Sequence, residues 1–276
     1  MIPKEVFKFF ADLIYDRSGM VYLEKDYYRL ESRIKDMVKL FEVEDTQALY
    51  WLFKEKITPD MEAVLNNIST NNETFFFRDI KPFKTLTNFV LPELEKVYPN
   101  DPLKIWSCAC SSGQEPYSIL MSIDSDLPPK NFQLTSVDAS DISKKILEKA
   151  KSGIYNGLDV QRGLPIDLLM KYFTQLETGD WQIAKKIMNK VLFSEFNLLT
   201  GNYPANKYHI IFCRNVLIYQ DVKNKSDVIN HIYSALKPGG YMFLGNGESL
   251  ISIESDFKRV TFEGMTIYQK EKKATL

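Results

Sequence analysis

The spacing of apolar residues predicts helices throughout the first quarter of the chain. Apolar side chains recur every three to four residues, the period of a helix with one buried face, in three groups: Val6, Phe9, Phe10, Leu13 and Ile14; Leu30, Ile34, Met37, Val38 and Phe41; and Leu49, Leu52 and Phe53. No alternating, strand-like run interrupts these groups. We therefore expect residues 1–71 to form an all-helical N-terminal domain.

From about residue 100 the pattern changes to short apolar runs separated by helical stretches. The runs are rich in β-branched and aromatic residues and are bounded by turns, as buried parallel strands are; they cover 103–109, 132–138, 191–196, 208–213 and 241–246. Helical patterns separate them at 116–123, 143–153 and 225–237. This alternation predicts an α/β fold over residues 72–276, with a doubly wound, mostly parallel sheet and an edge hairpin at 257–270.

Residues 172–196 break the alternation. They contain turn-forming residues at 178–180, an alternating segment at 181–184 and a strand candidate at the end. A small antiparallel β-subdomain, inserted in the sheet domain, fits this pattern better than a helix does.

Composition narrows the classes of partner. The chain has 276 residues, a net charge of −1 and a pI near 6.2, so it lacks the basic field that drives nucleic-acid binding. No apolar run approaches the ~18 residues of a membrane span, and acids interrupt the N-terminal stretch where a signal peptide needs a continuous apolar segment. We expect a soluble, cytoplasmic protein.

The cysteines and histidines favour structural roles. Cys108, Cys110 and Cys213 lie in or beside predicted strands, where free cysteine behaves as a small buried hydrophobe. A C-x-C pair without a second ligand pair falls short of a metal site, so no metal is expected. His209 begins a core strand and His231 lies in a helix, and without a G-x-S-x-G elbow a Ser/His/Asp hydrolase is disfavoured.

Two junctions between an apolar run and a polar turn are the strongest candidates for a binding site. They are ACSSGQEPYS at 109–118 and IIFCRNVLIY at 210–219. Ligands of open α/β sheets bind where strands end, so both junctions should line one cleft that holds a nucleotide-like cofactor. In the first, Gly113 lets the backbone approach a ligand closely.

Further polar residues follow predicted strands. Asp138 and Asp141 end the second strand, where an acid accepts hydrogen bonds from ribose hydroxyls in nucleotide-binding sheets; a helix N-cap is the equal alternative for Asp141. Arg214 and Asn215 come directly after the 208–213 run, and Tyr219 lies a turn later. Asn215 has the alternative role of capping the next element.

The segment NNETFFFRD at 71–79 surrounds three phenylalanines with amides, a hydroxyl and Arg78, at the joint between the two predicted domains. One interpretation is an aromatic plug with Arg78 in a surface pair. The other is a dry pocket in which the guanidinium fork clamps a carboxylate.

The helix predicted from Tyr27 to Phe41 carries four cations: Arg29, Arg33, Lys35 and Lys39. An ordinary solvated face is the simpler interpretation. A docking surface for an acidic partner helix is the functional one.

Six separated segments together resemble one family. NNETFFFRD, ACSSGQEPYS, ASDIS, FNLL, FCRNVLIY and LKPGGYMFLG, in this order and at these intervals, are similar to the motifs of the CheR chemotaxis receptor methyltransferases. The resemblance covers essentially the whole chain. It implies a Rossmann-like class I S-adenosylmethionine-dependent methyltransferase domain, with a small β-subdomain and an N-terminal helical domain for receptor recognition.

The resemblance also implies roles for individual positions. Cofactor contacts fall on Asn72, Thr74, Arg78, Gly113, Glu115, Asp141, Asn197, Leu198, Asn215 and Val216. Glu115 and Asp141 would hold the amino and ribose ends of the cofactor. Arg78 and Tyr219 would flank the reacting methyl group. The chain departs mildly from the family pattern, with Gln114 where an acid is common and Gln220 where phenylalanine is usual.

The implied activity is methyl esterification of glutamate side chains on the cytoplasmic helical bundle of chemoreceptors, with S-adenosyl-L-methionine converted to S-adenosyl-L-homocysteine. A carboxylate is already a nucleophile at neutral pH, since its pKa is about 4.3, so no catalytic base is needed. The protein would be a monomer that reaches the membrane only through its receptor. Two alternatives remain: a methyltransferase for another carboxylate acceptor, and a cofactor-binding scaffold without catalysis.

Some family members bind a receptor C-terminal pentapeptide on the β-subdomain by strand addition. The turn LETGDW is short and holds one glycine, Gly179, where peptide-binding members have a longer and more glycine-rich loop. We expect the subdomain to be present and the pentapeptide not to be required.

Overall fold

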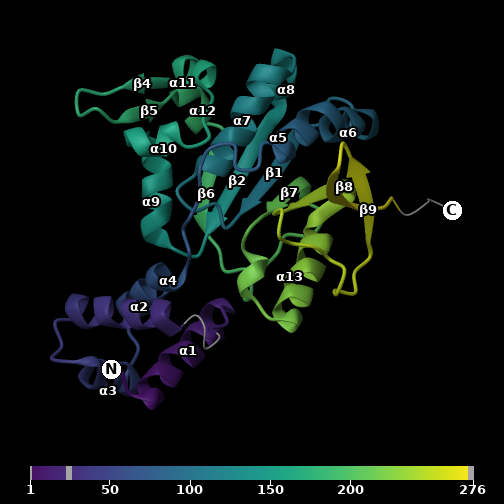
Figure 1. Cartoon of the computed structure of the whole chain (residues 1–276). Helices are drawn as coiled ribbons and strands as arrows, with labels where there is room; N and C mark the ends of the chain where they lie inside the picture. Colours follow the sequence, from purple (N-terminus) through teal and green to yellow (C-terminus); the bar gives the residue numbers. More distant parts are fainter. Residues whose placement is uncertain (1, 23–26, 273–276) are drawn as a thin grey trace.

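A seven-stranded sheet forms the larger part of the molecule in a computed structural model that describes residues 2–22 and 27–272 (Figure 1). The strand order is β6-β2-β1-β7-β8-β10-β9. The strands are β1 Leu103–Cys108, β2 Thr135–Asp141, β6 Val191–Glu195, β7 Tyr208–Cys213, β8 Leu236–Leu244, β9 Phe257–Phe262 and β10 Met265–Lys270. Strands β6, β2, β1, β7 and β8 run parallel to one another. Strand β10 pairs antiparallel with β8, and β9 pairs antiparallel with β10. The predicted doubly wound sheet with an edge hairpin is confirmed.

Alternate side chains of the central strands pack on opposite faces of the sheet. Ile105 and Phe212 belong to a core shared with the helices on one face, while Trp106 and Ile211 belong to a core that includes α13 on the other. The helices around the sheet are α5 Lys81–Thr85, the π-helical turn η2 Leu86–Val90, α6 Leu91–Val97, α7 Gln114–Asp126, α8 Pro129–Leu134, α9 Lys144–Ser152 and α13 Val222–Ala235. Because both faces are covered, the central strand β7 is buried at every position rather than at alternate positions.

Two strand boundaries differ from the prediction. Residues 129–134 form α8, because Pro129 stands at its first turn, so β2 begins only at Thr135. Strand β8 begins at Leu236 and includes the KPGG segment, which forms an irregularity in the pairing of β7 with β8. The KPGG segment therefore lies within the strand as a bulge.

The small antiparallel subdomain is present, but its composition differs from the prediction. Its sheet has the order β3-β5-β4, from β3 Ile154–Tyr155, β4 Phe173–Gln175 and β5 Trp181–Ile183. Short helices accompany it: α10 Gly157–Gln161, α11 Ile166–Tyr172 and α12 Lys185–Met188. The strand at 191–195 belongs to the main sheet instead, where it pairs with β2. The subdomain thus begins near residue 154, earlier than the predicted 172.

The N-terminal helices form a lobe with a core of its own, below the sheet domain in Figure 1. They are α1 Lys4–Ser18, α2 Tyr27–Leu40, α3 Thr46–Glu55 and α4 Pro59–Ser69. Backbone contacts join this lobe to the segment after β7: Met20 pairs with Gln220, and the Val21 amide donates to the Tyr219 carbonyl at 2.9 Å. This contact fixes the lobe beside the carboxyl ends of the parallel strands.

Within the described ranges, none of the helices combines the length and apolar character that crossing a bilayer demands.

Candidate active site

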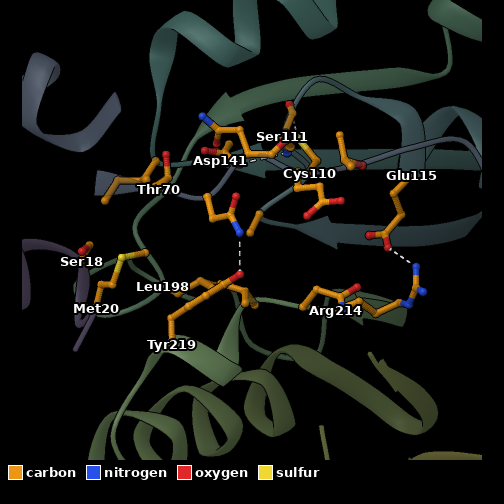
Figure 2. A pocket seen from close by; sticks show the side chains of 18 of the residues that line it. Ser18, Met20, Thr70, Cys110, Ser111, Glu115, Asp141, Leu198, Arg214 and Tyr219 are labelled. Carbon is orange, nitrogen blue, oxygen red and sulfur yellow. Dashed lines mark hydrogen bonds and ion pairs between the residues drawn. The ribbon is translucent and has the colours of Figure 1, made fainter. Parts of the chain in front are cut away.

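A cleft lies at the carboxyl end of the parallel strands, where the helical lobe meets the sheet (Figure 2). Its walls come from the loops after β1, β2 and β7, from residues 70–75, and from Ser18 and Met20. Both strand-end junctions singled out in the sequence line this one cleft.

Asp141 is fixed at the end of β2, in the cleft wall. Its two carboxylate oxygens accept backbone N–H groups, from Ser143 at 3.0 Å and from Ser111 at 2.9 Å. Burial raises the pKa of the Asp141 carboxyl above its usual value, and the backbone donors oppose that shift. Each oxygen keeps further acceptor capacity for a ligand hydroxyl.

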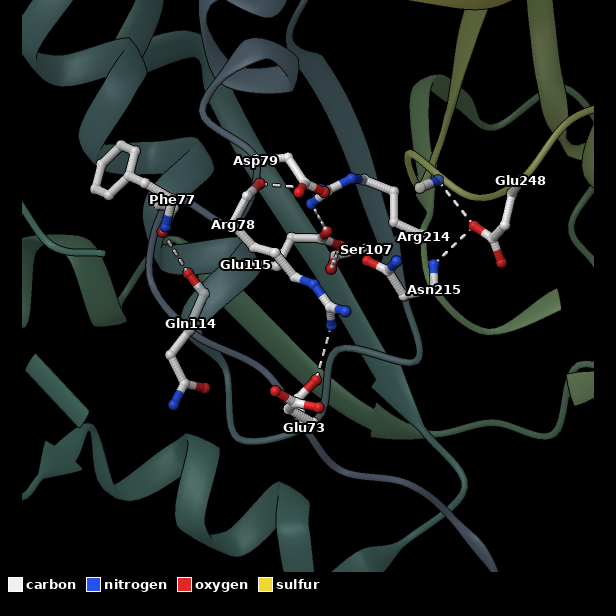
Figure 3. A network of polar contacts seen from close by, with 12 residues as sticks. Glu73, Phe77, Arg78, Asp79, Ser107, Gln114, Glu115, Arg214, Asn215 and Glu248 are labelled. Carbon is white, nitrogen blue, oxygen red and sulfur yellow. Dashed lines mark hydrogen bonds and ion pairs between the residues drawn. The ribbon is translucent and has the colours of Figure 1, made fainter. Parts of the chain in front are cut away.

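Glu115 and Arg214 form a buried ion pair that joins the two junctions (Figure 3). Arg214 follows β7, and its side chain is 1% exposed. It donates to Glu115 at 2.8 Å, to Asp79 at 2.7 Å and to the Arg78 carbonyl at 2.9 Å. The other oxygen of Glu115 accepts from Ser107 of β1 at 2.7 Å. The network therefore fixes the Glu115 carboxylate and the backbone that carries Arg78.

Arg78 lies half-buried in the cleft wall, with its guanidinium 5.6 Å from the centre of the Phe75 ring. It donates to the Glu73 carbonyl at 2.9 Å. Within the described part of the chain it has no carboxylate partner, so its fork is available to an anionic ligand.

Tyr219 approaches the cleft from the short 3-10 turn η3 Leu217–Tyr219. Its hydroxyl accepts a hydrogen bond from Asn71 at 2.7 Å (Figure 2). Asn72 and Thr74 line the cleft beside it, and the Asn72 carbonyl accepts from Ser111 at 2.9 Å. The 71–74 segment is thus held between the two strand-end junctions.

The remaining walls come from residues 196–198 and 215–216. Asn197 donates to the Arg17 carbonyl at 2.7 Å and accepts from the Leu199 amide at 2.9 Å, so its amide shapes the loop. Leu198 and Val216 contribute apolar surface to the cleft. Asn215 lines the cleft with its backbone in the left-handed region, at a φ of 59°.

A family model described as "CheR methyltransferase, SAM binding domain" matches residues 72–265. The chain belongs to the CheR methyltransferase family. The chemotaxis protein methyltransferase Cher2 of Pseudomonas putida is 36% identical to it, over 91% of this chain and 92% of the relative. Chemotaxis protein methyltransferase 1 of Pseudomonas aeruginosa is 36% identical, over 95% and 97%. The chemotaxis protein methyltransferase of Escherichia coli is 30% identical, over 96% and 91%.

As a CheR methyltransferase, the protein uses S-adenosyl-L-methionine, and its cleft has the groups this molecule requires. Asp141 is an acceptor suited to a ribose diol, Glu115 to an ammonium group, and Arg78 is a donor suited to a carboxylate. Leu198 supplies apolar surface of the kind suited to an adenine. In the described chain the buried Nε of Arg214, in the cleft wall, has no hydrogen-bond partner, which leaves one further donor beside the site.

Two candidates from the sequence lie elsewhere. Gly113 is outside the cleft lining: at a φ of 90° it turns the chain into α7, and a Cβ there would lie 3.1 Å from the Tyr155 hydroxyl. Its contribution is therefore to the turn. Asp138 lies within β2 and accepts from Lys207 at 2.6 Å and Tyr208 at 2.8 Å, away from the cleft.

The predicted basic surface on α2 needs a correction. Arg33 points inward and donates to the Tyr22 hydroxyl and to the carbonyls of Ser69 and Thr70, and burial lowers its pKa. Because these internal hydrogen bonds occupy its guanidinium, Arg33 is not available to bind a partner protein. Lys35 and Lys39 are exposed, and Lys35 pairs with Glu31 at 2.8 Å. Arg29 is half-buried, so the exposed cations of α2 are the two lysines.

Sequence reasoning missed several residues that hold the site together. Ser107 and Glu248 each bind a residue of the cleft from outside its predicted motifs, and Asp79 binds Arg214 from the end of the 71–79 segment. Neither Asp79 nor Arg214 has a role predicted from the sequence. An arginine directly after an apolar strand was the one local signal, because such a charge needs buried partners. The structure also confirms that Cys108, Cys110 and Cys213 are buried.

Proposed function

We propose that this CheR methyltransferase transfers a methyl group from S-adenosyl-L-methionine to glutamate side chains on the cytoplasmic helices of a chemoreceptor. Its relatives are named chemotaxis protein methyltransferases, which supports a role in chemotaxis. The observation that carries the chemistry is the Arg78 guanidinium, which lines the cofactor cleft without a carboxylate partner in the described chain.

The cofactor supplies an electrophilic methyl group on a positively charged sulfur. Arg78 holds the acceptor carboxylate by its planar fork, which fixes both oxygens, and Tyr219 closes the opposite side of the reacting position. An ionised glutamate needs no base, because its pKa is about 4.3. The chain's main contribution is alignment, an effect that amounts to as much as ~7–11 kcal/mol in well-oriented reactions.

The cleft geometry supports the cofactor contacts that the family resemblance implies. Asp141 accepts the ribose hydroxyls, and Glu115 accepts the ammonium group while Arg214 holds the Glu115 carboxylate in place. The walls around the methionine portion and the adenosine are formed by Asn72, Thr74, Asn197, Leu198, Asn215 and Val216.

The two parts of the chain have separate tasks in this proposal. Residues 1–71 recognise the receptor, and residues 72–276 bind the cofactor and carry out the transfer. Exposed Lys35 and Lys39 on α2 attract the acidic receptor helices, since complementary charge mainly speeds encounter.

The test uses methyl-labelled S-adenosyl-L-methionine and the cytoplasmic fragment of a chemoreceptor from the source organism. We expect label to enter the fragment as an ester that mild alkali releases as methanol. A fragment with its acceptor glutamates changed to glutamine is the control and should remain unlabelled.

Two other results would overturn the proposal. Label on small carboxylic acids but not on the fragment would indicate a different acceptor. Binding of S-adenosyl-L-homocysteine without transfer to either would indicate a scaffold.

A further inference from the structure

Glu248 lies in the loop after β8, outside the cleft lining, yet its carboxylate contacts the cleft loop (Figure 3). Its Oε2 accepts the backbone N–H groups of Asn215 at 2.7 Å and Gly245 at 2.8 Å. Its Oε1 accepts those of Leu217 at 2.8 Å and Ile218 at 3.2 Å. One side chain thus satisfies four backbone donors.

Three of these donors belong to the turn that presents Asn215 and Tyr219 to the cleft. This turn is not a regular element: Asn215 has a φ of 59°, and η3 spans only Leu217–Tyr219. Asparagine adopts the left-handed region more readily than most residues do, and the backbone N–H of Asn215 is bound there by Glu248. The carboxylate of Glu248 is the group that binds the turn on both sides of Val216.

The loop of Glu248 packs directly against the same turn. A Cβ at Gly245 would lie 2.6 Å from the Asn215 side-chain nitrogen and 2.9 Å from its backbone nitrogen. There is no room for a side chain at this position. The close approach and the four hydrogen bonds together make the 245–248 loop the support for the turn.

We propose that Glu248 is a positioning residue of the methyl-transfer site, whose carboxylate holds the 215–219 turn so that Asn215 and Tyr219 face the cofactor. This rests on the proposed function for the identity of the reaction. The order of the turn and its effect on cofactor affinity do not depend on the acceptor.

The substitution Glu248→Gln tests the carboxylate itself. An ionised carboxylate is acceptor-only on both oxygens, whereas an amide has one acceptor oxygen and an NH₂ that opposes the remaining backbone donors. Two of the four N–H groups therefore lose their acceptor, while the size of the side chain stays the same.

Tyr268→Phe is the matched control. The Tyr268 hydroxyl accepts the Leu250 amide at 3.1 Å, so this change also removes an acceptor from a backbone donor in the loop after β8. It leaves the hydrogen bonds of the 215–219 turn intact. Any general loosening of the loop should appear in both variants.

The measurements are hydrogen exchange of backbone amides, calorimetry with S-adenosyl-L-homocysteine, and the methylation rate. For Glu248→Gln we expect faster exchange in peptides that contain 215–218, a Kd for S-adenosyl-L-homocysteine raised by about tenfold or more, and a lower kcat. Tyr268→Phe should change the Kd by no more than about twofold. If Glu248→Gln does not fold, Glu248→Asp, which keeps the charge but shortens the reach, is measured by the same criteria.

Wild-type exchange at 215–218 in the variant, or an equal loss of affinity in both variants, would overturn the proposal. Failure of the wild-type protein to methylate a receptor fragment would instead count against the proposed function, because the exchange and calorimetric results need no receptor.

Discussion

Replacing Glu115 by glutamine removes the negative charge of this side chain but keeps its size. Glu115 lies where the methionine part of the cofactor is proposed to bind. The carboxylate accepts from Ser107 at 2.7 Å and from Arg214 at 2.8 Å. A glutamine can keep both contacts, with its oxygen toward Arg214 and its amide toward the serine hydroxyl, which can also accept. Arg214 retains Asp79 as an anionic partner. Glu115→Gln should therefore fold and lose mainly the negative charge.

The expected loss falls on the cofactor's ammonium group. A hydrogen bond to a charged partner contributes about 1.5–3 kcal/mol, which corresponds to an increase in Kd of about 10- to 100-fold. The free energy of unfolding should fall by about 1–3 kcal/mol, because the buried pair with Arg214 is weakened but not left without any anion.

Calorimetry with two ligands isolates this contact. S-adenosyl-L-homocysteine should bind Glu115→Gln about 10- to 100-fold more weakly than the wild type. The analogue without its amino group should bind both proteins alike. Glu93→Gln serves as the control, since Glu93 lies outside the cleft lining and forms an exposed pair with Lys96, of a kind that contributes about 0–1 kcal/mol. Equal losses for both ligands, or no loss for either, would refute the assigned contact.

Four other outcomes test the account. Arg78→Lys should lower kcat at least about tenfold because lysine lacks the planar fork, and Tyr219→Phe should lower kcat with cofactor affinity nearly intact; initial rates equal to wild type would show these assignments to be wrong. Changing Lys35 and Lys39 to glutamate should raise KM for a receptor fragment at low salt and less so at high salt, and an unchanged KM at low salt would return α2 to an ordinary solvated face. Burial, reinforced by a neighbouring lysine, lowers the pKa of His209 to about 4, so the unfolded chain binds more protons and the free energy of unfolding should fall by about 2 kcal/mol between about pH 8 and pH 5. Urea titrations should show a smaller fall for His209→Gln, and identical slopes would contradict the assignment. A receptor-tail pentapeptide of the Asn-Trp-Glu-Thr-Phe type should show no binding by calorimetry, whereas micromolar binding would contradict the expectation from the short turn.

The main sheet was predictable because most of its strands contain short apolar runs between turns. Strand β7, Tyr208–Cys213, is buried throughout, and its sequence contains no competing helical period. By contrast, strand β3 of the small sheet, Ile154–Tyr155, has only two residues. A pairing that short leaves no periodic pattern, so the sequence could not place it.

On helix α2, the prediction of an exposed cation from charge alone was wrong for Arg33, although its position in the helix indicated a partly buried side chain. Arg33 stands three residues after Leu30 and four before Met37, both of which are buried. Residues at these spacings share one helix face, so Arg33 lies at the edge of the buried side. Counting its charge with those of the exposed lysines ignored this geometry.

The residues that line the cleft could be predicted in part, because they follow strands or lie in motifs. Their supports could not: Arg214 contacts Glu115 across 99 positions, and Glu248 contacts Asn215 across 33. Such contacts depend on the topology of the sheet, and no local pattern encodes them.

The most direct test of the central claim is peptide mass spectrometry of a chemoreceptor cytoplasmic fragment after incubation with the protein and S-adenosyl-L-methionine. We expect the wild-type protein to place methyl groups on glutamate side chains of the receptor helices. In a parallel reaction with the Arg78→Lys variant, these methyl groups should be lost. Methyl groups on other side chains, or an unmodified fragment in the presence of a protein that binds S-adenosyl-L-homocysteine, would contradict the central claim.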